Sequence, residues 1–512
     1  MNRDKIHSLI VRRLHPVIRF AAVAIFLSLP ITSMPLLSRV LGNTLVAPPS
    51  VLFLFFLLLG WLPVFLLRRD SMPAETYPLL VFIIIAIISS ALAFFLPLPP
   101  YKGNSILGEE IRAMLTLAIG AAFYIATSTW FRDLNKLTGA LRLINISGFL
   151  IVAWSLSQLY IILVENGHYP LWMDRVQQLL SVRSILDPVS KTRLVGFTYE
   201  PSWLANQLNT LYLPFWLAAT LSGYSAFKKV WKISLENFLL VSGLVVLVFS
   251  YSRIGLLAFL LVLAYAILRL HSFAIRWAQS RVSQRWKILT RMSPLHQRLM
   301  TVLTLLIYGL LIFLLLSFVA RTDYRVQKLL ALEEIPTNFY EFAFKVDFAE
   351  RVVYWTNGWS VFARYPLLGV GLGNAGFFFR EHLPNLAFRL NEILTLIDQA
   401  PYVPNTKSIW ARLPAETGIV GMACFIAWLY VLWRAGRWLE TKHQPLRVLG
   451  WMGTFSIIAY LAEGFSVDSF ALPYIWVSLG LVTAASAAAR RQVEASDSES
   501  VHEETRPLST SF

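Results

Sequence analysis

Long apolar blocks separated by short polar segments run through the whole chain. About 20 consecutive apolar residues cross the hydrocarbon core of a bilayer as one helix, and the sequence contains roughly twelve such blocks. They cover residues 20–37, 45–67, 77–99, 111–131, 143–164, 203–221, 234–249, 254–270, 299–319, 408–433, 448–463 and 470–489. The pattern predicts an all-α polytopic membrane protein of about 12 transmembrane helices with a large, partly helical outer loop.

The blocks also predict how the chain is divided. The predicted parts are transmembrane helices 1–9 within residues 1–319, a large outer loop at 320–407, transmembrane helices 10–12 within 408–491, and a disordered tail at 492–512. The tail is rich in Ser, Glu and Asp and poor in apolar residues, which is typical of disorder.

Two of the predicted spans carry residues that are unusual in a membrane helix. The first contains Pro30 and Pro35, and the sixth contains Asn206, Gln207 and Asn209. The first block follows a basic stretch but has no clean cleavage site, so we interpret it as a retained anchor rather than a signal peptide.

Composition agrees with a membrane protein. Of the 512 residues, 56% are hydrophobic and 14% are charged, whereas soluble domains carry roughly a quarter charged residues. A soluble enzyme is therefore excluded. The single cysteine, Cys424, excludes an intrachain disulfide, and the sequence has no Cys/His cluster with metal-ligand spacing.

The charges predict the orientation of the chain. If residue 1 is cytoplasmic, the segments on its side hold 27 Lys+Arg and 11 Asp+Glu and the opposite segments hold 18 and 18, which sum to 45 and 29. The whole net charge of +16 then lies on one side, and basic loops remain in the cytoplasm. We expect both termini to be cytoplasmic and the basic loops to contact anionic membrane lipids rather than nucleic acid.

The two long outer loops are the expected location of function. They cover residues 165–202 and 320–407, and long ordered loops of this kind usually carry function. The larger one is aromatic, and its pattern predicts an amphipathic helix over 339–364. We expect this loop to cover the outer mouth of the bundle.

Charged residues gather next to the predicted outer ends of the spans. They are Arg193, Glu200, Arg253, Arg351, Lys407 and Glu416. Charge near a membrane is costly unless it is paired or solvated in a cavity. Several cations on one face could converge on an anionic ligand, and arginine matches phosphate with two parallel hydrogen bonds.

Each of these residues also has a purely structural interpretation. Arg253 could extend its head group to the interface, and Arg193 and Arg351 could be solvated loop charges. Lys407 could be an interfacial anchor. The carboxylate of Glu200 could complement the start of a helix, and Glu416 could hold a helical turn.

A glycine-rich run at 369–376 contains the spacing GxGxxG at Gly371, Gly373 and Gly376. A dinucleotide site needs a preceding strand and a following helix in a βαβ unit, and the sequence predicts neither here. We therefore expect a loop that returns toward the membrane, not a nucleotide site.

Taken together, these stretches resemble the bacterial O-antigen ligase and polymerase superfamily of integral membrane glycosyltransferases. Three motifs carry the resemblance: Arg253 in SYSRIG, Arg351 and Trp355 followed by YPLLGVGLGN, and KSIWARLPAETGIVG with Lys407, Trp410 and Glu416. The stretch FTYEPSWLA, which contains Glu200, is more similar to the polymerases of the superfamily than to the ligases. The resemblance covers roughly residues 190–435.

The resemblance implies a polyprenyl-diphosphate-linked oligosaccharide as donor, transferred to a glycan acceptor at the outer face of the bacterial inner membrane. It implies inversion at the sugar and no metal or other cofactor. Arg193, Arg253 and Arg351 would neutralise the departing diphosphate, and Glu200 would accept the proton of the acceptor hydroxyl. Lys407, Trp355, Trp410 and Glu416 would contribute to substrate binding.

Position 407 departs from the pattern of the family, because many ligases have a histidine where this chain has Lys407. A lysine is protonated near neutral pH unless it is strongly desolvated. Lys407 should therefore bind the diphosphate rather than accept a proton, which leaves Glu200 as the expected base.

Three functions remain open from the sequence. The first is a polymerase of lipid-linked repeats, which would work with a flippase and a chain-length regulator. The second is a ligase that transfers finished glycan to lipid A core or to protein. The third is a lipid-glycan flippase or transporter, for which internal repeats and sites near the middle of the membrane are expected.

Overall fold

Helices make up the named secondary structure of the computed structural model. The model describes residues 3–40, 44–68, 71–229, 231, 233–285 and 338–504, with scattered positions between 302 and 328. Within these residues no strand is present, and two isolated bridges join Ser33 to Ala47 and to Ser181. The predicted all-α architecture is confirmed for the part of the chain that is described.

The helices, in chain order, are α1 (Arg3–Ser28), α2 (Pro35–Val40), α3 (Ser50–Arg68), η1 (Ala74–Thr76), α4 (Tyr77–Ala93), α5 (Ile106–Trp130), α6 (Leu134–Val164), α7 (Leu171–Leu180), α8 (Pro201–Gln207), η2 (Leu208–Tyr212), α9 (Leu213–Ser222), α10 (Leu235–Phe249), α11 (Arg253–Arg285), α14 (Phe339–Lys345), α15 (Ala349–Arg364), η3 (Ala375–His382), η4 (Asn385–Arg389), α16 (Asn391–Asp398), α17 (Ile409–Leu439), α18 (Leu446–Glu463) and α19 (Pro473–Glu504). They fall into two units. Unit 1 comprises Met1–Ala258, Trp355–His382 and Pro401–Phe512, and unit 2 comprises Phe259–Tyr354 and Leu383–Ala400.

Five of the described helices are long and apolar enough to cross a membrane. They are Ala74–Ala93, Ile106–Trp130, Leu134–Val164, Arg253–His271 and Ile409–Leu439, and three shorter apolar helices are Leu14–Ser28, Ser50–Leu66 and Leu235–Phe249. The predicted ninth span, 299–319, lies largely outside the described residues. The apolar helices agree with an integral membrane protein, although the number twelve stays a prediction.

The first predicted span is shifted relative to the structure. Helix α1 ends at Ser28, whereas the prediction placed a span at 20–37. Pro30 explains the end, because proline has no backbone N–H and disfavours helical geometry in the residue before it. The chain resumes as the short helix α2 at Pro35.

The sixth predicted span is helical but irregular. It consists of α8, the π-helical segment η2 and α9. The polar residues Asn206, Gln207 and Asn209 are all buried, so they face protein rather than lipid. A π-helical turn within a helix often marks a functional site.

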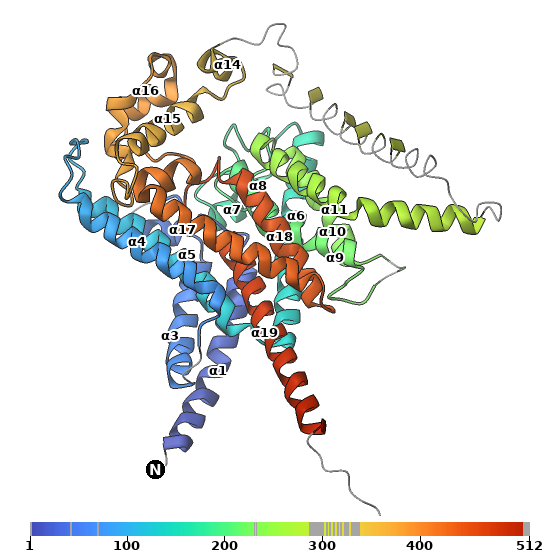
Figure 1. Cartoon of the computed structure of the whole chain (residues 1–512). Coiled ribbons are helices and arrows are strands. Elements are labelled where there is room, and N and C mark those ends of the chain that lie inside the picture. Colours follow the sequence, from blue (N-terminus) through green and yellow to red (C-terminus); the bar gives the residue numbers. More distant parts are fainter. Residues whose placement is uncertain are drawn as a thin grey trace, which may run out of the picture. The chain divides into compact units, whose positions relative to one another are not determined.

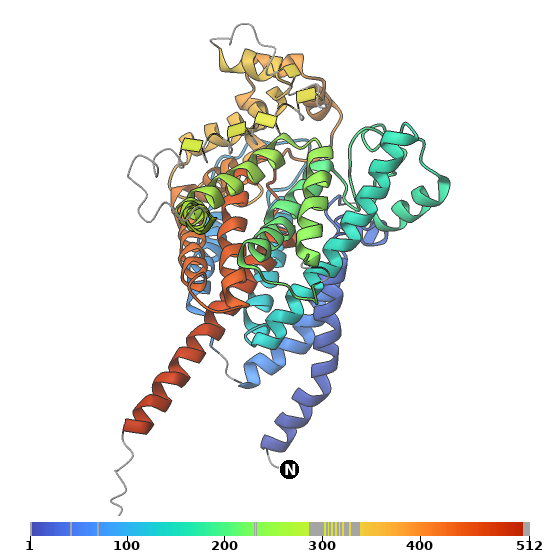
Figure 2. The same cartoon turned by 90° about the vertical axis from the view of Figure 1, so that its right-hand side faces the viewer.

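Helices distant in sequence pack together within unit 1. Helix α17 contacts α4 and α18, α18 contacts α9 and α19, and α19 contacts α5 (Figure 1). Small residues permit this packing: a Cβ atom on Gly148 of α6 would overlap the ring of Trp216 of α9. Close approach at small residues is typical of membrane helices. The start of α1 and the end of α19 lie at the same end of unit 1 in both views (Figures 1 and 2).

The loop at 165–202 is ordered and contains α7. The carboxylate of Asp174 accepts hydrogen bonds from Ser184 Oγ at 2.7 Å and from the backbone N–H of Ile185 at 3.2 Å. The loop is also bonded to the segment after α1, since Tyr199 N donates to Thr32 Oγ1 at 3.1 Å. The loop and the segment after α1 are therefore in direct contact.

The amphipathic helix predicted over 339–364 is two helices in the structure. Helix α14 ends at Lys345 and α15 begins at Ala349. Asp347, between them, has a φ of 52°, which lies in the left-handed region and cannot continue a right-handed helix.

The last helix extends into the tail, for which the sequence predicts disorder over 492–512. Helix α19 continues past the apolar segment to Glu504. Once packing has nucleated a helix, each added residue gains one hydrogen bond at little cost. The residues after Glu504 lie outside the described residues.

Candidate functional site

Arg193 is bonded to the turn that carries Arg253. Its Nε donates to the carbonyl oxygen of Ser250 at 3.1 Å, and its Nη2 donates to that of Tyr251 at 3.0 Å. The backbone N–H of Leu194 donates to Phe249 O at 3.1 Å. These carbonyls lie at the C-terminal end of α10, where the helix dipole favours a cation. The segments that carry Arg193 and Arg253 are thus hydrogen-bonded to each other.

Arg253 is the first residue of α11. Ser252 precedes it, and the Ser252 hydroxyl accepts a hydrogen bond from Gly255 N at 3.3 Å. The first N–H groups of a helix have no partner within the helix and attract anions. Arg253 is half-buried. It therefore adds a positive charge at a helix end that already attracts anions.

Glu200 precedes α8 and is half-buried. Its Oε2 accepts a hydrogen bond from Ser202 Oγ at 3.0 Å. Helix α8 packs closely on the first turn of α11, since a Cβ atom on Gly255 would lie 2.6 Å from Cβ of Ala205. The stretches around Glu200 and Arg253 are therefore neighbours in unit 1.

Glu463, which the sequence analysis did not select, is the last residue of α18 and is 1% exposed. Its Oε1 accepts a hydrogen bond from Asn209 Nδ2 at 2.6 Å, and the same nitrogen donates to Gly255 O at 2.8 Å. Asn206 also faces this carboxyl group. The signals in the sequence were a glutamate inside an apolar block and the amides of the sixth span.

Lys407 lies in a strained turn before α17, with a φ of 50°. The next residue, Ser408, donates from Oγ to Gly464 O at 3.0 Å, and Ile409 N donates to the same oxygen at 2.8 Å. Gly464 directly follows Glu463. The turn of Lys407 is thus bonded to the end of α18.

The two tryptophans predicted to bind substrate contact the same end of α18. Trp410 is buried and donates from Nε1 to Leu461 O at 2.9 Å. Trp355 lies with its ring centroid 5.4 Å from that of Phe465. The indole N–H of Trp410 is therefore already hydrogen-bonded to the protein backbone.

Glu416 is buried in an ion pair. Its Oε2 lies 2.8 Å from Nε of Arg412, which in turn donates from Nη1 to Asp468 O at 2.7 Å. The side chain of Glu416 is 5% exposed. This geometry corresponds to the structural alternative, in which Glu416 holds the helix.

The glycine-rich run returns to the bundle, as expected for it. The backbone N–H groups of Val370 and Gly371 donate to the carbonyls of Ala415 and Glu416, each at 3.0 Å. On the other side, Gly371 N donates to Ser89 Oγ of α4 at 3.2 Å. The run lies between α4 and α17, and no strand precedes it among the described residues.

Arg351 belongs to unit 2, in the first turn of α15. Unit 2 has its own contacts, including a hydrogen bond from Tyr354 OH to Glu392 Oε1 at 2.9 Å and the guanidinium of Arg389 over the ring of Phe344. The role predicted for Arg351 continues to depend on its sequence motif.

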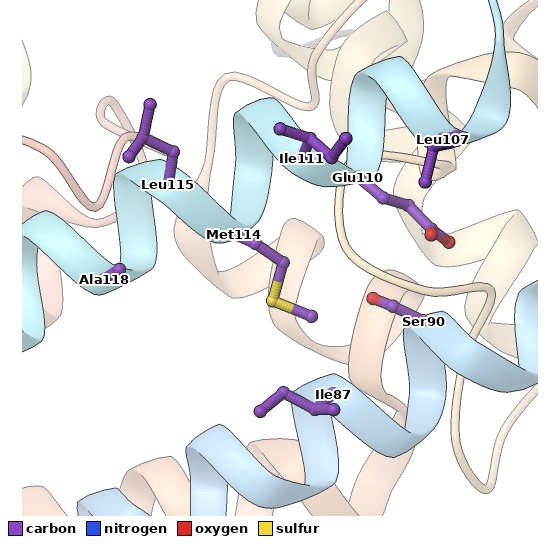
Figure 3. A pocket seen from close by; sticks show the side chains of 8 residues that line it. All are labelled: Ile87, Ser90, Leu107, Glu110, Ile111, Met114, Leu115 and Ala118. Atoms are coloured by element: carbon purple, nitrogen blue, oxygen red, sulfur yellow. The ribbon is translucent and has the colours of Figure 1, made fainter.

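A separate cavity of about 480 Å³ lies between α4 and α5 (Figure 3). Its lining is Ile87, Ser90, Leu107, Glu110, Ile111, Met114, Leu115 and Ala118. Figure 3 shows the carboxyl of Glu110 near Ser90 at one end, where Glu110 Oε1 accepts a hydrogen bond from Asn374 at 2.8 Å. The lining contains no cation, so this cavity does not have the chemistry of a diphosphate site.

Of the eight predicted site residues, unit 1 holds seven, all except Arg351. Bonds between their segments link Arg193 to the turn of Arg253, and link that turn to the turn of Lys407 through Asn209 and Glu463. Within the described residues, no group of three or more His, Cys, Asp or Glu could hold a metal ion. The arrangement is a set of cationic turns around a buried acidic residue.

The comparisons with known proteins bear on the same region. The search of curated proteins finds no significant match to this chain. Residues 238–426 match the family model described as O-antigen ligase, a range that includes Arg253, Arg351 and Lys407 but not Arg193 or Glu200. The match confirms the resemblance to the O-antigen ligase and polymerase superfamily that the three motifs predicted.

Proposed function

We propose that this protein is a polymerase that joins lipid-linked oligosaccharide repeats at the outer face of the bacterial inner membrane. The family match supports a function of the O-antigen ligase and polymerase type in an integral membrane protein. The observation that carries the proposal is the hydrogen bonding of Arg193 to the turn of Arg253, which brings two cationic segments together at one end of the predicted spans.

The proposed chemistry follows from these charges. An acceptor hydroxyl attacks the anomeric carbon of the donor, the bond from that carbon to the diphosphate oxygen breaks, and the sugar is inverted. The lipid diphosphate leaves with an additional negative charge. Arg193, Arg253 and Lys407 would stabilise that charge, as fixed donors do where charge develops in a transition state. Arg351 would join them by analogy with its motif.

Glu200 is the proposed general base. A base must lie within hydrogen-bond reach of the proton that it removes. Glu200 is half-buried at the start of α8, the helix whose Ala205 packs on the first turn of α11. In the proposed reaction the proton of the acceptor hydroxyl moves to this carboxylate as the new glycosidic bond forms.

The choice of polymerase over ligase depends on the stretch FTYEPSWLA, residues 197–205, which is more similar to the polymerases. A ligase is the second candidate, because the matching family model is described as O-antigen ligase. The two functions use the same donor chemistry and differ in the acceptor. It is another lipid-linked repeat for a polymerase, and lipid A core or protein for a ligase.

The proposed topology places both termini in the cytoplasm. The start of α1 and the end of α19 lie at the same end of unit 1 (Figures 1 and 2), and the basic loops favour the cytoplasmic side. A flippase that delivers the repeat and a chain-length regulator are the partners that such a polymerase would need.

The test is incubation of the purified full-length protein with a lipid-linked repeat alone. A ladder of products of increasing length supports the polymerase. Transfer that occurs only after a core acceptor is added would identify a ligase instead. Movement of the lipid across vesicles without a new glycosidic bond would contradict both and indicate a flippase.

A further inference from the structure

Two of the buried glutamate–asparagine pairs in unit 1 have the same chemistry but different surroundings. Glu236 Oε1 accepts from Asn145 Nδ2 at 2.7 Å, and Glu463 Oε1 accepts from Asn209 Nδ2 at 2.6 Å. Both glutamates are at most 1% exposed. Comparing the two pairs shows which hydrogen bonds a buried carboxylate normally has and which of them the Glu463 pair lacks.

The Glu236 pair is fully bonded. Its Oε2 accepts from Ser225 Oγ at 2.9 Å, and its Oε1 also accepts from the backbone N–H of Ala226 at 2.9 Å. Buried carboxylates normally have such partners, because an unbonded one loses the hydrogen bonds that it had with water. This pair is explained by structure alone.

The Glu463 pair is not fully bonded. Its Oε2 and the Oδ1 of Asn209 accept no hydrogen bond within the described residues, although both atoms are buried. Asn206 faces the same carboxyl without satisfying Oε2. Underbonded buried groups cost stability, and a role in a functional site is one explanation for keeping them.

The Glu463 pair also joins the segments that carry the predicted cations. Asn209 Nδ2 bonds Gly255 O, two residues after Arg253. At the other end, Gly464 accepts bonds from Ser408 Oγ and Ile409 N, directly after Lys407. The pair of side chains therefore connects the sixth, eighth and eleventh predicted spans, and the backbone of Gly464, the residue after Glu463, adds the tenth.

From this connection we propose that Glu463 and Asn209 are positioning residues, which hold the turns of Arg253 and Lys407 in the geometry that binds a lipid-linked diphosphate. The inference depends on the proposed function, because it takes the diphosphate as the ligand of these cations. A displacement of about 1 Å far from the chemistry can lower a rate about 100-fold, so loss of the pair should act on catalysis as well as on stability.

The experiment compares the two pairs in the full-length protein. N209A and E463A should each lower kcat per folded molecule about 10- to 100-fold, and N209A/E463A should be no worse than either single variant, because both changes remove one interaction. E463Q should retain kcat within about 3-fold, since its amide oxygen still accepts from Asn209. The controls N145A and E236A should lower the melting temperature while leaving kcat per folded molecule unchanged.

Two results would overturn the inference. One is wild-type kcat in folded E463A and N209A. The other is an E463Q variant as inactive as E463A, which would make Glu463 a proton acceptor instead.

A measurement of lipid binding shows whether this inference or the proposed function is wrong. Undecaprenyl diphosphate should raise the melting temperature of the wild-type protein, and E463A should need at least about 10-fold more of this lipid for the same shift, beyond what N145A needs. If the wild-type protein binds the lipid but makes no glycan, the polymerase proposal fails and the positioning role is still tested by binding. If E463A binds the lipid as tightly as the wild-type protein, the positioning role is wrong.

Discussion

The guanidinium of Arg193 donates a hydrogen bond from Nη2 to the carbonyl oxygen of Tyr251, 3.0 Å away. Arg193 belongs to the loop at 165–202, and Tyr251 lies two residues before Arg253. The contact joins the loop of Arg193 to the turn that carries Arg253. Arg193 therefore holds the turn of Arg253 in place. Substituting Arg253 is the more direct test of diphosphate binding.

Replacing Arg253 by alanine should lower kcat/KM for the lipid-linked repeat about 100- to 1000-fold, the usual effect of removing one donor that stabilises developing charge. The product ladder and the initial rate of the purified protein measure it. Arg112→Ala is the matched control, because Arg112 is exposed and paired only across one helical turn with Glu109, and such pairs contribute little. Equal rates for the two variants would exclude Arg253 from the clamp.

Glu200→Gln should reduce turnover far more than donor binding. The amide keeps the size of the side chain and its acceptor oxygen for Ser202 but cannot accept the proton of the acceptor hydroxyl. Single-turnover rates and lipid binding, measured on the same preparation, separate the two effects. If turnover persists at the wild-type rate, the base is another group.

Glu416→Leu should destabilise the protein strongly, because it leaves the guanidinium of Arg412 buried without its carboxylate. Breaking a buried pair on one side costs about 3–5 kcal/mol. The double variant R412M/E416L should recover part of the loss, since apolar pairs can replace buried ion pairs. Melting temperature in detergent reports both. A stable E416L protein that no longer binds donor would instead support the substrate role predicted for Glu416.

Gly418→Ala should also lower stability. Gly418 interrupts α17 with φ 64° and ψ −169°, a conformation that is essentially restricted to glycine and costs about 1–3 kcal/mol for other residues. A Cβ atom there would also overlap the carbonyl of Leu367. The control Gly139→Ala lies within α6 with nothing near its Cβ position and should leave stability unchanged or raise it. Similar melting temperatures for both variants would contradict this geometry.

Stability should depend on pH through Glu440, which follows α17. Burial raises the pKa of this carboxyl from 4.5 to about 7, although Arg437 and Thr454 act in the opposite direction. Between these two values the folded state binds more protons than the unfolded state, so the free energy of unfolding falls as the pH rises from about 4.5 to 7. Melting temperatures from pH 5 to pH 8 should decline less in E440Q than in the wild-type protein, and identical slopes would assign the dependence to other groups.

Hydrophobic pattern alone determined the helical, membrane-embedded character of this chain. The blocks that became α5, α6 and α17 are long and apolar, and in a bilayer the backbone of such a segment must satisfy its hydrogen bonds within itself. The sequence also supplied the motifs around Arg253, Trp355 and Lys407, and all three lie within the residues that match the family model. Boundaries were less secure where proline or a left-handed residue ended a helix, as at Pro30 and Asp347.

Only the tertiary structure decided which of the polar residues meet. Asn209 and Glu463 are 254 positions apart, and nothing in either local pattern indicates that α18 packs on η2. The ion pair of Glu416 with Arg412 spans one turn of α17 and follows from local spacing, whereas its burial depends on packing in unit 1. A pattern of hydrophobic residues determines which segments cross the membrane, but the partner of a buried charge is determined by helix packing, which brings distant segments into contact.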